Sequence, residues 1–157
     1  MIIKKINTSL LTKEERNILK DNQALLIGSR ARIITLNTQE IASDSDILFW
    51  GDKPNWEKLP SGKRSEGHRA IRIKSSQFDL IYSKEASNFL DAFWYFVDYT
   101  ISAIAILFTE DEGFVAIMHE DTERHYQEKK LVLLQDSHNG YREDRRKKFE
   151  NCGFNNN

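Results

Sequence analysis

The sequence predicts an α+β domain in which helices flank a mixed, strongly twisted sheet. Short runs rich in Ile, Val, Phe and Tyr recur between polar turns, as expected for strands. Segments with helix-start signals lie between them, and two pairs of apolar runs stand close enough together to form hairpins. The chain has 157 residues, of which 39% are hydrophobic and 30% charged, so residues 1–157 suffice for a single domain with one core.

The first predicted elements are a capped helix, a strand and a second helix. The sequence TKEE has the pattern of a capping box, so a helix is expected over residues 13–20, within an N-terminal helix region of residues 1–23. The apolar run ALLIG, which follows, is typical of a buried strand. Gly28 and Ser29 then predict a tight turn that leads into a short helix over residues 30–36.

The middle of the chain predicts three strands around a polar loop. DILFW is an apolar strand, and residues 51–68 after it form a loop with both prolines and one helical turn around Trp56. Trp56 either stacks on a base or pins the loop. RAIRIK alternates polar and apolar residues, which indicates a half-exposed strand, and QFDLIYS follows after two serines as its expected hairpin partner.

The C-terminal half is predicted to mix helices and strands. Residues 85–95 have a helical composition. DEG then separates ISAIAILF from FVAIM, which favours a second hairpin, with a continued helix as the alternative. Beyond the hairpin the sequence predicts a helix in DTERHYQEKK, a strand in LVLLQ and a closing helix in YREDRRKKFE. Residues 139–157 are thus expected to form a C-terminal basic helix and tail.

Composition and charge limit the functional classes. The net charge of -1 provides no overall field for a polyanion, so RNA would have to meet a local basic patch. A single cysteine excludes an internal disulfide and suits the cytoplasm. The longest apolar stretch contains Asp91 and Asp98. Each would cost roughly 3 kcal/mol at the centre of a membrane, so we expect this stretch to be core.

Two aspartates at the head of the DILFW strand are the first candidate functional residues. Side chains two apart in a strand share a face, so the carboxylates of Asp44 and Asp46 would repel each other unless a cation lay between them. Oxygen ligands suit Mg²⁺ or Mn²⁺ rather than zinc. Asp79, an acidic residue between apolar neighbours in QFDLIYS, is the candidate third ligand. The three aspartates therefore predict a two-ion centre for in-line displacement at phosphorus.

The Gly-Ser turn supplies a candidate phosphate site. A glycine turn followed at once by a helix N-terminus presents backbone N–H groups to phosphate oxygens, and the hydroxyl of Ser29 would join them. Arg30 and Arg32 would add positive charge nearby. Gly28-Ser29, then Asp-x-Asp, then a later aspartate in a strand is a more specific order than any of the parts alone.

These residues resemble a known signature. IGSRAR followed by SDSDILFWG is similar to the Gly-Ser and Asp-x-Asp pattern of the polymerase-β-like nucleotidyltransferases, and FDLIY to the strand that supplies their third carboxylate. DYTISAIAI is similar to a segment of CCA-adding enzymes and bacterial poly(A) polymerases beside the ribose of the incoming nucleotide, which implies such a place for Asp98 and Thr100. GYREDRRKKFENCGF resembles their neck region, which implies that Asp144 and Lys147 face the base.

The sequence departs from that family at several points. Ile33 stands where many members have glycine, Phe96 and Val97 replace an arginine pair, and Lys147 takes the place of an arginine. We also expect no counterpart of the helical RNA-binding domains that follow in the tRNA enzymes. The chemistry is therefore implied more strongly than the acceptor.

Ordinary structural roles remain open for the outer candidate residues. Asp98 and Thr100 would also serve as caps at the end of a helix or strand. Asp144 and Lys147 would also form a solvated pair three residues apart on a helix.

The resemblance implies an enzyme that transfers a nucleoside monophosphate from a nucleoside triphosphate to an acceptor hydroxyl and releases pyrophosphate, with Mg²⁺ as cofactor. The expected acceptor is an RNA 3′ end of tRNA type, held by the basic last helix or by a separate partner. Nucleotidylation of a protein or a small-molecule hydroxyl is the alternative within the enzyme class, and a non-catalytic nucleotide-binding regulator lies outside it. We expect a cytoplasmic protein with no membrane partner, and the oligomeric state stays open.

Overall fold

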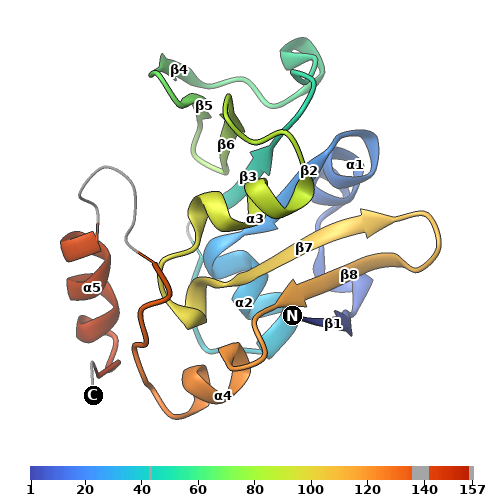
Figure 1. The fold of residues 1–157 in the computed structure, drawn as a ribbon. Helices are drawn as coiled ribbons and strands as arrows, with labels where there is room; N and C mark the ends of the chain where they lie inside the picture. Colours follow the sequence, from blue (N-terminus) through green and yellow to red (C-terminus); the bar gives the residue numbers. More distant parts are fainter. Residues whose placement is uncertain (43, 136–141, 156–157) are drawn as a thin grey trace.

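The computed structural model describes residues 1–42, 44–135 and 142–155, and its strands form one eight-stranded sheet (Figure 1). The strands are β1 (Ile2–Lys5), β2 (Ala24–Ile27), β3 (Ser45–Phe49), β4 (Lys63–Glu66), β5 (Ala70–Lys74), β6 (Phe78–Ser83), β7 (Ile104–Thr109) and β8 (Gly113–Met118). They stand in the order β1-β8-β7-β2-β3-β6-β5-β4. Strands β3 and β6 are parallel and the other neighbours antiparallel, which confirms the predicted mixed sheet.

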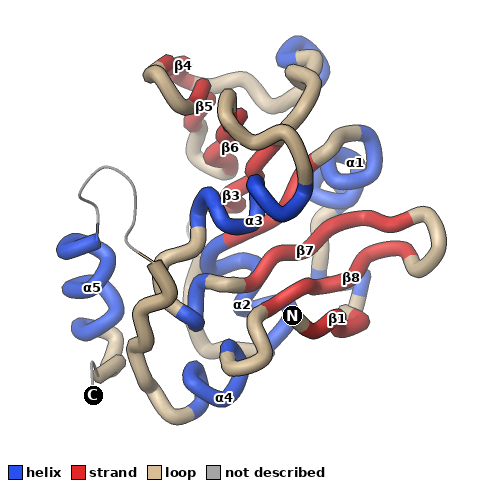
Figure 2. Tube along the Cα trace, in the orientation of Figure 1, coloured by secondary structure: helices blue, strands red, loops and turns tan. Residues whose placement is uncertain are grey.

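Helices cover both faces of the sheet (Figure 2). The α-helices of the described residues are α1 (Lys13–Asp21), α2 (Gly28–Leu36), α3 (Phe89–Phe96), α4 (Thr122–Gln127) and α5 (Arg142–Asn151). Three short 3₁₀ helices accompany them: η1 (Thr8–Leu10), η2 (Trp56–Lys58) and η3 (Thr100–Ser102). Helices α1 and α2 pack on one face and α3 on the other, so the predicted α+β fold is confirmed.

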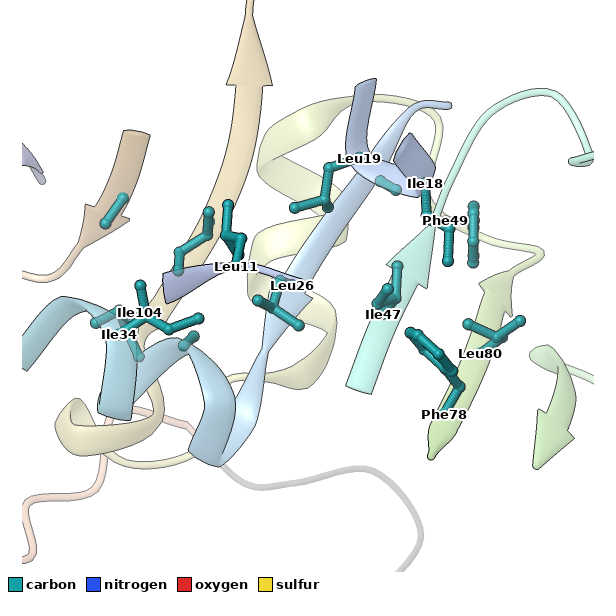
Figure 3. Packing of buried hydrophobic residues seen from close by; sticks show 14 of the residues in the cluster. Leu11, Ile18, Leu19, Leu26, Ile34, Ile47, Phe49, Phe78, Leu80 and Ile104 are labelled. Carbon is teal, nitrogen blue, oxygen red and sulfur yellow. The ribbon is translucent and has the colours of Figure 1, made fainter. Parts of the chain in front are cut away.

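The larger core lies between the sheet and helices α1 and α2. Ile18 and Leu19 of α1 meet strand residues such as Leu26 and Ile47 in a single apolar cluster (Figure 3). Burial of a side chain of this size stabilises a fold by roughly 1.5–3 kcal/mol. Helix α5 docks separately, where Phe149 and four other apolar side chains form a small cluster. The larger apolar core therefore packs helices α1 and α2 against the sheet, while α5 packs through a smaller, separate cluster.

Most predicted elements are confirmed near their expected bounds. Thr12 and Glu15 form the capping box of α1 by two reciprocal hydrogen bonds. Both hairpins are present, β5 with β6 and β7 with β8. The long apolar stretch is divided among α3, η3 and β7, and no helix in the described part of the chain is long and apolar enough to cross a membrane. Its assignment to the core is thus confirmed.

Two predictions about local structure are corrected, and two strands were missed. The expected strand in LVLLQ is an irregular segment with one isolated bridge, between Leu133 and Tyr99. Its backbone N–H groups serve the carbonyl of Asp98 instead of a ladder, since those of Leu134 and Gln135 both donate there. Strands β1 and β4 were not predicted, because both are edge strands whose side chains lie mostly in solvent and lack an apolar pattern. Helix α2 begins at Gly28 itself, without an intervening turn.

Side-chain alternation sends the predicted carboxylates to the α3 face of the sheet. In β3, Ile47 belongs to the core under α1, while Leu48 belongs to the core under α3. Asp46 has the same parity as Leu48 and shares its face. In β6, Asp79 likewise lies opposite to the α1 side, because its neighbour Leu80 belongs to the α1 core.

Candidate active site

Asp46 and Asp79 lie side by side because their strands are parallel and paired in register. Asp46 is the partner of Asp79 on one side and of Ile27, the last residue of β2, on the other. Gly28 follows at once as the first residue of α2. The end of β2 and the starts of β3 and β6 thus bring the Gly-Ser segment and two predicted carboxylates to the corner between the start of α2 and the ends of these central strands.

Asp44, immediately before β3, adds its charge to this corner. The pKa of Asp46 is raised from 3.8 to about 6, first by burial and then by the charges of Asp44 and Asp79. The charges of Arg72 and Lys148 act in the opposite direction. The carboxylates therefore repel one another, as the sequence predicted. Lys148 comes from α5, so this helix brings a positive charge toward the corner that the sequence did not assign to it.

Gly28 allows the carboxylate of Asp46 to lie against the start of α2. Its φ is +70°, in the left-handed region that favours glycine, and a Cβ built there would stand 2.7 Å from Oδ2 of Asp46. Ser29, the next residue, is half-buried in the first turn. The N-terminus of α2 and the Asp46 carboxylate therefore lie together. Phosphate binding at this N-terminus stays a prediction.

Asp79 is held by an arginine that sequence reasoning missed. Its carboxylate is almost fully buried and accepts two hydrogen bonds from Arg72, 2.8 Å from Nε to Oδ1 and 2.5 Å from Nη2 to Oδ2. Arg72 lies in β5, whose residue Lys74 is the direct partner of Asp79. A usable signal existed, because alternation in the predicted hairpin places Arg72 and Asp79 on one face, two positions apart.

The donor set fits a hard divalent cation, with one condition. Carboxylate oxygens are the ligands that Mg²⁺ and Mn²⁺ prefer. Burial first, and the charges of Asp44 and Asp79 second, raise the pKa of Asp46, so its ionised form lacks full compensation. Among the described residues, however, no three His, Cys, Asp or Glu side chains are grouped closely enough to form a metal site as they stand. Arg72 contacts both carboxylate oxygens of Asp79, so a metal site formed by Asp44, Asp46 and Asp79 stays a prediction that requires a change in this contact.

Arg30 links the Gly-Ser segment to a buried glutamate. Its guanidinium donates to Glu15, 3.1 Å from Nε to Oε2 and 2.6 Å from Nη2 to Oε1. The hydroxyl of Ser45, between the two aspartates, donates to the same Oε2 at 2.7 Å. Burial alone would raise the pKa of Glu15, but the hydrogen bonds from Arg30, Thr12 and Ser45 outweigh it and leave the pKa below 4.5. Glu15, which sequence reasoning treated only as a cap, thus ties both halves of the motif together.

Arg32 is also committed to a carboxylate. It is almost fully buried, donates to Glu40 at 2.8 and 2.9 Å, and lies 5.4 Å from the centre of the Phe149 ring. Arg30 and Arg32, the two arginines predicted to lie near phosphate, therefore form ion pairs with Glu15 and Glu40. A direct contact of Arg30 or Arg32 with phosphate stays a prediction.

Asp98 and Thr100 are buried where α5 meets the domain. Asp98 accepts hydrogen bonds from the Tyr99 N–H at 2.7 Å and the Ser102 hydroxyl at 2.6 Å, and forms an ion pair with Arg145 of α5. Thr100 shares a 2.8 Å hydrogen bond with Nδ1 of His125. These contacts give both residues a structural role, so their place beside a ribose stays a prediction.

Asp144 and Lys147 are both exposed on α5. No ion pair joins them among the described side chains, so the predicted solvated pair is not formed. Their outward position leaves them accessible, and base recognition by them stays a prediction. Trp56 packs edge-on against Phe49 with ring centres 6.1 Å apart, which supports the loop-pinning interpretation.

A cavity of about 630 Å³ opens beside Asp44. It lies between α1 and the start of β3, on the side of the strand to which Ser45 belongs. Eight of its ten lining residues are polar or charged, namely Thr12, Lys13, Glu14, Asn17, Arg30, Asp44, Ser45 and Gln77, and the other two are Ala42 and Phe78. The cavity therefore adjoins Asp44 but lies on the opposite side of β3 from Asp46.

The structure of the chain is similar to solved structures, although its sequence matches no family model. No protein-family model matches the sequence, and a comparison with curated protein sequences gives no match. Solved structures do match. The CCA-adding enzyme of Thermotoga maritima complexed with tRNA gives a TM-score of 0.57 at 18% identity, covering 86% of this chain and 37% of that one.

Two further CCA-adding enzyme structures agree. A complex with ATP gives a TM-score of 0.57 and a complex with CTP 0.55, each at 19% identity and with the same coverage. The chain therefore has a nucleotidyltransferase-type fold, which confirms the resemblance stated from the sequence. It spans 37% of the length of these enzymes.

Proposed function

We propose that the chain is a nucleotidyltransferase that transfers a nucleoside monophosphate from a nucleoside triphosphate to an acceptor hydroxyl and releases pyrophosphate. One observation carries the proposal: Asp46 and Asp79 are paired in register beside Asp44, and Gly28 lets the start of α2 meet Asp46. This arrangement stands on a fold shared with CCA-adding enzymes, which supports the same class of chemistry.

Asp44, Asp46 and Asp79 are the proposed ligands of Mg²⁺, with Mn²⁺ as a substitute. Two such ions, when bound, stabilise the attacking and leaving oxygens of an in-line displacement at phosphorus. Without a cation, ionised Asp46 is held at an energetic cost, since its pKa lies about two units above the ordinary value. That cost favours cation binding over an empty site.

The start of α2 is the proposed site for the β- and γ-phosphates. Its backbone N–H groups and partial positive charge favour an anion, and the Ser29 hydroxyl would donate a hydrogen bond. Arg30, anchored on Glu15, fixes the helix next to β3. The positive charge of Lys148, in α5, lowers the pKa of Asp46. The same charge would partly neutralise a triphosphate bound there.

The transfer needs one bond made, one broken and one proton moved. The acceptor oxygen bonds to the α-phosphorus, and the bond from that phosphorus to the bridging oxygen breaks. The electron pair leaves with pyrophosphate, and the acceptor proton passes to a carboxylate of the site. Asp79 is the proposed recipient, because it lies next to Asp46 and away from the α2 start.

An RNA 3′ end is the favoured acceptor. The similar structures include a CCA-adding enzyme complexed with tRNA and others with ATP and CTP. Lys147 and Lys148 are exposed on α5 and would meet a phosphate backbone. Asp98, Thr100, Asp144 and Lys147 keep their proposed places near the ribose and base. The single cysteine, exposed Cys152, is consistent with the cytoplasm as the proposed location.

A small-molecule or protein hydroxyl is the second candidate acceptor. The cavity beside Asp44 has a volume of about 630 Å³, which suits a compact ligand, and such an acceptor would have to reach past Asp44 to the face that carries Asp46 and Asp79. A non-catalytic regulator would use the same site for nucleotide binding alone.

The test is an acceptor survey with labelled nucleotides. Each of the four nucleoside triphosphates, labelled at the α-phosphate or, in a separate reaction, at the γ-phosphate, is incubated with the protein, Mg²⁺ and either cellular RNA, total protein or a panel of small alcohols. We expect α-label on RNA 3′ ends, and no transfer of label from the γ-position, because that label leaves in pyrophosphate. Label on protein or on a small alcohol would select the second candidate.

Two outcomes would contradict nucleotidyl transfer itself. Transfer of γ-label would indicate a kinase. Nucleotide binding without pyrophosphate release, with every acceptor, would indicate the regulator. Asp46→Asn should abolish transfer. Asp111→Asn, in the exposed turn between β7 and β8, is its matched control and should retain full transfer.

A further inference from the structure

Arg72 occupies both carboxylate oxygens of Asp79. The pair is bidentate, with distances of 2.8 and 2.5 Å, and joins a carboxylate that is 4% exposed to an arginine that is 48% exposed. A bidentate pair of this kind is stronger than an ordinary hydrogen bond and fixes the orientation of the carboxylate. The third candidate ligand is therefore already bound to a cation of the protein's own.

The charges around the Arg72–Asp79 pair disfavour the binding of a second divalent ion. Asp44, Asp46 and Asp79 carry three formal negative charges. Arg72 neutralises one of them by direct contact, and the positive charge of Lys148 also acts on Asp46. One divalent ion at Asp44 and Asp46 would therefore leave no net negative charge for a second ion, which would also have to compete with a guanidinium for the two oxygens of Asp79.

The position of Arg72 would allow its guanidinium to leave Asp79 for another anion. Its side chain is half-exposed and lies on the same face of the sheet as Asp46, and its charge acts on Asp46 as well. Asp46, on which the charge of Arg72 acts, lies between Asp79 and the start of α2. A guanidinium that leaves Asp79 would thus face the phosphates of a triphosphate bound at Asp46 and the start of α2. Arginine recognises phosphate oxygens with the same fork that it uses on carboxylates.

We propose that Arg72 is a positioning residue that exchanges Asp79 for the triphosphate. It holds the third carboxylate in the empty protein and disfavours a second divalent ion there. When nucleotide arrives, the guanidinium passes to a phosphate and Asp79 becomes available to the ion. The second ion and the nucleotide therefore bind cooperatively. This inference rests on the proposed function, because it requires the three aspartates to be the metal ligands.

The alternative is a fixed structural pair. Arg72 would then compensate the buried charge of Asp79 in every state, and its removal would weaken the fold without any gain in ion affinity. The two roles differ in the sign of the effect on ion binding, which can be measured without any catalytic turnover.

The experiment is a Mn²⁺ titration, followed by the electron paramagnetic resonance signal of unbound Mn²⁺, with and without a non-hydrolysable ATP analogue. The proteins are wild type, Arg72→Gln and the control Lys74→Gln. Lys74 is exposed, lies on the same strand and face, and is the direct sheet partner of Asp79. Its replacement removes the same charge from the same neighbourhood but leaves the bidentate pair intact.

We expect Arg72→Gln to raise the affinity for the second Mn²⁺ ion by roughly tenfold in the absence of nucleotide, and Lys74→Gln by less than about twofold. The ATP analogue should strengthen this second binding step in wild type and much less in Arg72→Gln. Asp79→Asn in the Arg72→Gln background should remove the gain. Equal effects of the two single variants, or a loss of affinity in Arg72→Gln, would overturn the proposal.

Two further variants, Arg72→Lys and Asp46→Asn, separate a folding defect from a change in ion binding. Arg72→Lys retains charge but not the fork, and should give an intermediate gain if Arg72→Gln fails to fold; no gain from Arg72→Lys would count against the exchange. Asp46→Asn should abolish Mn²⁺ binding. If wild type shows no binding that depends on Asp46, the proposed function itself falls. If that binding is present and the Arg72 effect is not, the exchange alone falls.

Discussion

The carboxylate of Asp46 lies so close to the backbone of Gly28 that a side chain has no room between them. A Cβ on Gly28 would stand 2.7 Å from Oδ2 of Asp46, and the φ of +70° is itself unfavourable for any other residue. Only a glycine therefore lets the start of α2 and the strand with the two aspartates share one corner. This contact connects the Gly-Ser and Asp-x-Asp parts of the motif.

Gly28→Ala should reduce nucleotidyl transfer at least about a hundredfold, because a displacement of about 1 Å at a reacting group has that effect. The left-handed backbone should also cost about 1 to 2 kcal/mol of stability. Gly113→Ala is the matched control, since Gly113 has a φ of +73° but nothing within 4 Å of its added Cβ. It should lose similar stability and retain transfer. Equal rates in the two variants would show that the contact with Asp46 is unimportant.

Glu15→Gln should destabilise the protein and flatten its acid unfolding. Because the folded-state pKa of Glu15 lies below 4.5, its stabilising contribution is present above that pH and is lost as the pH falls through the lowered value. The variant should be less stable by about 2 to 3 kcal/mol at pH 7 and should show a weaker decline below pH 4.5. Urea unfolding at several pH values measures both quantities.

The neighbouring Glu14 provides the control for that experiment. It is exposed in the first turn of the same helix. Glu14→Gln should leave both the stability and its pH dependence close to those of wild type. A Glu15→Gln protein with the same acid profile as wild type would contradict the role given to the Glu15 network.

Arg145→Gln should loosen α5 from the domain. Arg145 pairs with Asp98, which is fully buried, and its guanidinium also lies 5.3 Å from the centre of the Phe149 ring. Loss of the pair leaves a buried charge and should cost about 2 to 3 kcal/mol. Amide hydrogen exchange should accelerate throughout α5 while the central strands stay protected.

Arg146→Gln, one residue further, separates this effect from a general loss of charge on α5. Arg146 pairs with Glu143 and Glu150 on the surface of its own helix. Such pairs contribute little to stability, so exchange in α5 should barely change. Comparable acceleration in both variants would indicate that Asp98 does not anchor the helix.

Local signals in the sequence identified much of this fold. The capping box of Thr12 and Glu15 located α1 to within one residue at its end, because its hydrogen bonds join residues three apart. The hairpins followed from alternation and short turns. LVLLQ was misassigned because an apolar run alone cannot tell a strand from a segment that covers a core, and here the backbone partner is Asp98, more than thirty residues away along the chain.

The site was predicted in part for a related reason. Asp44, Asp46 and Asp79 stand out by residue type and spacing, and the expected closeness of Asp46 and Asp79 is confirmed by the register of β3 with β6. Their partners could not be anticipated. The contact of Arg72 with Asp79 depends on the register of a hairpin, and that of Arg30 with Glu15 on how two helices pack. Positive charges near a motif therefore cannot be assigned to phosphate from sequence alone, since buried carboxylates compete for them.

Asp46 should oppose folding in the absence of a cation. Its pKa is about 6 in the folded protein and 3.8 ordinarily, so the protonated form contributes stability below pH 3.8 that is lost as the pH rises through 6. Asp46→Asn should thus raise stability at pH 8, with EDTA present, by roughly 1 to 3 kcal/mol. Little gain should remain at pH 4. Thermal unfolding at both pH values measures the difference.

The most direct test of the account is nucleotidyl transfer by Asp46→Asn, measured with α-labelled triphosphate and the acceptor identified for wild type, beside thermal unfolding of the same samples. The account predicts a folded variant, more stable than wild type in EDTA, whose transfer of label is lost entirely. A folded Asp46→Asn protein that transfers label at the wild-type rate would contradict it.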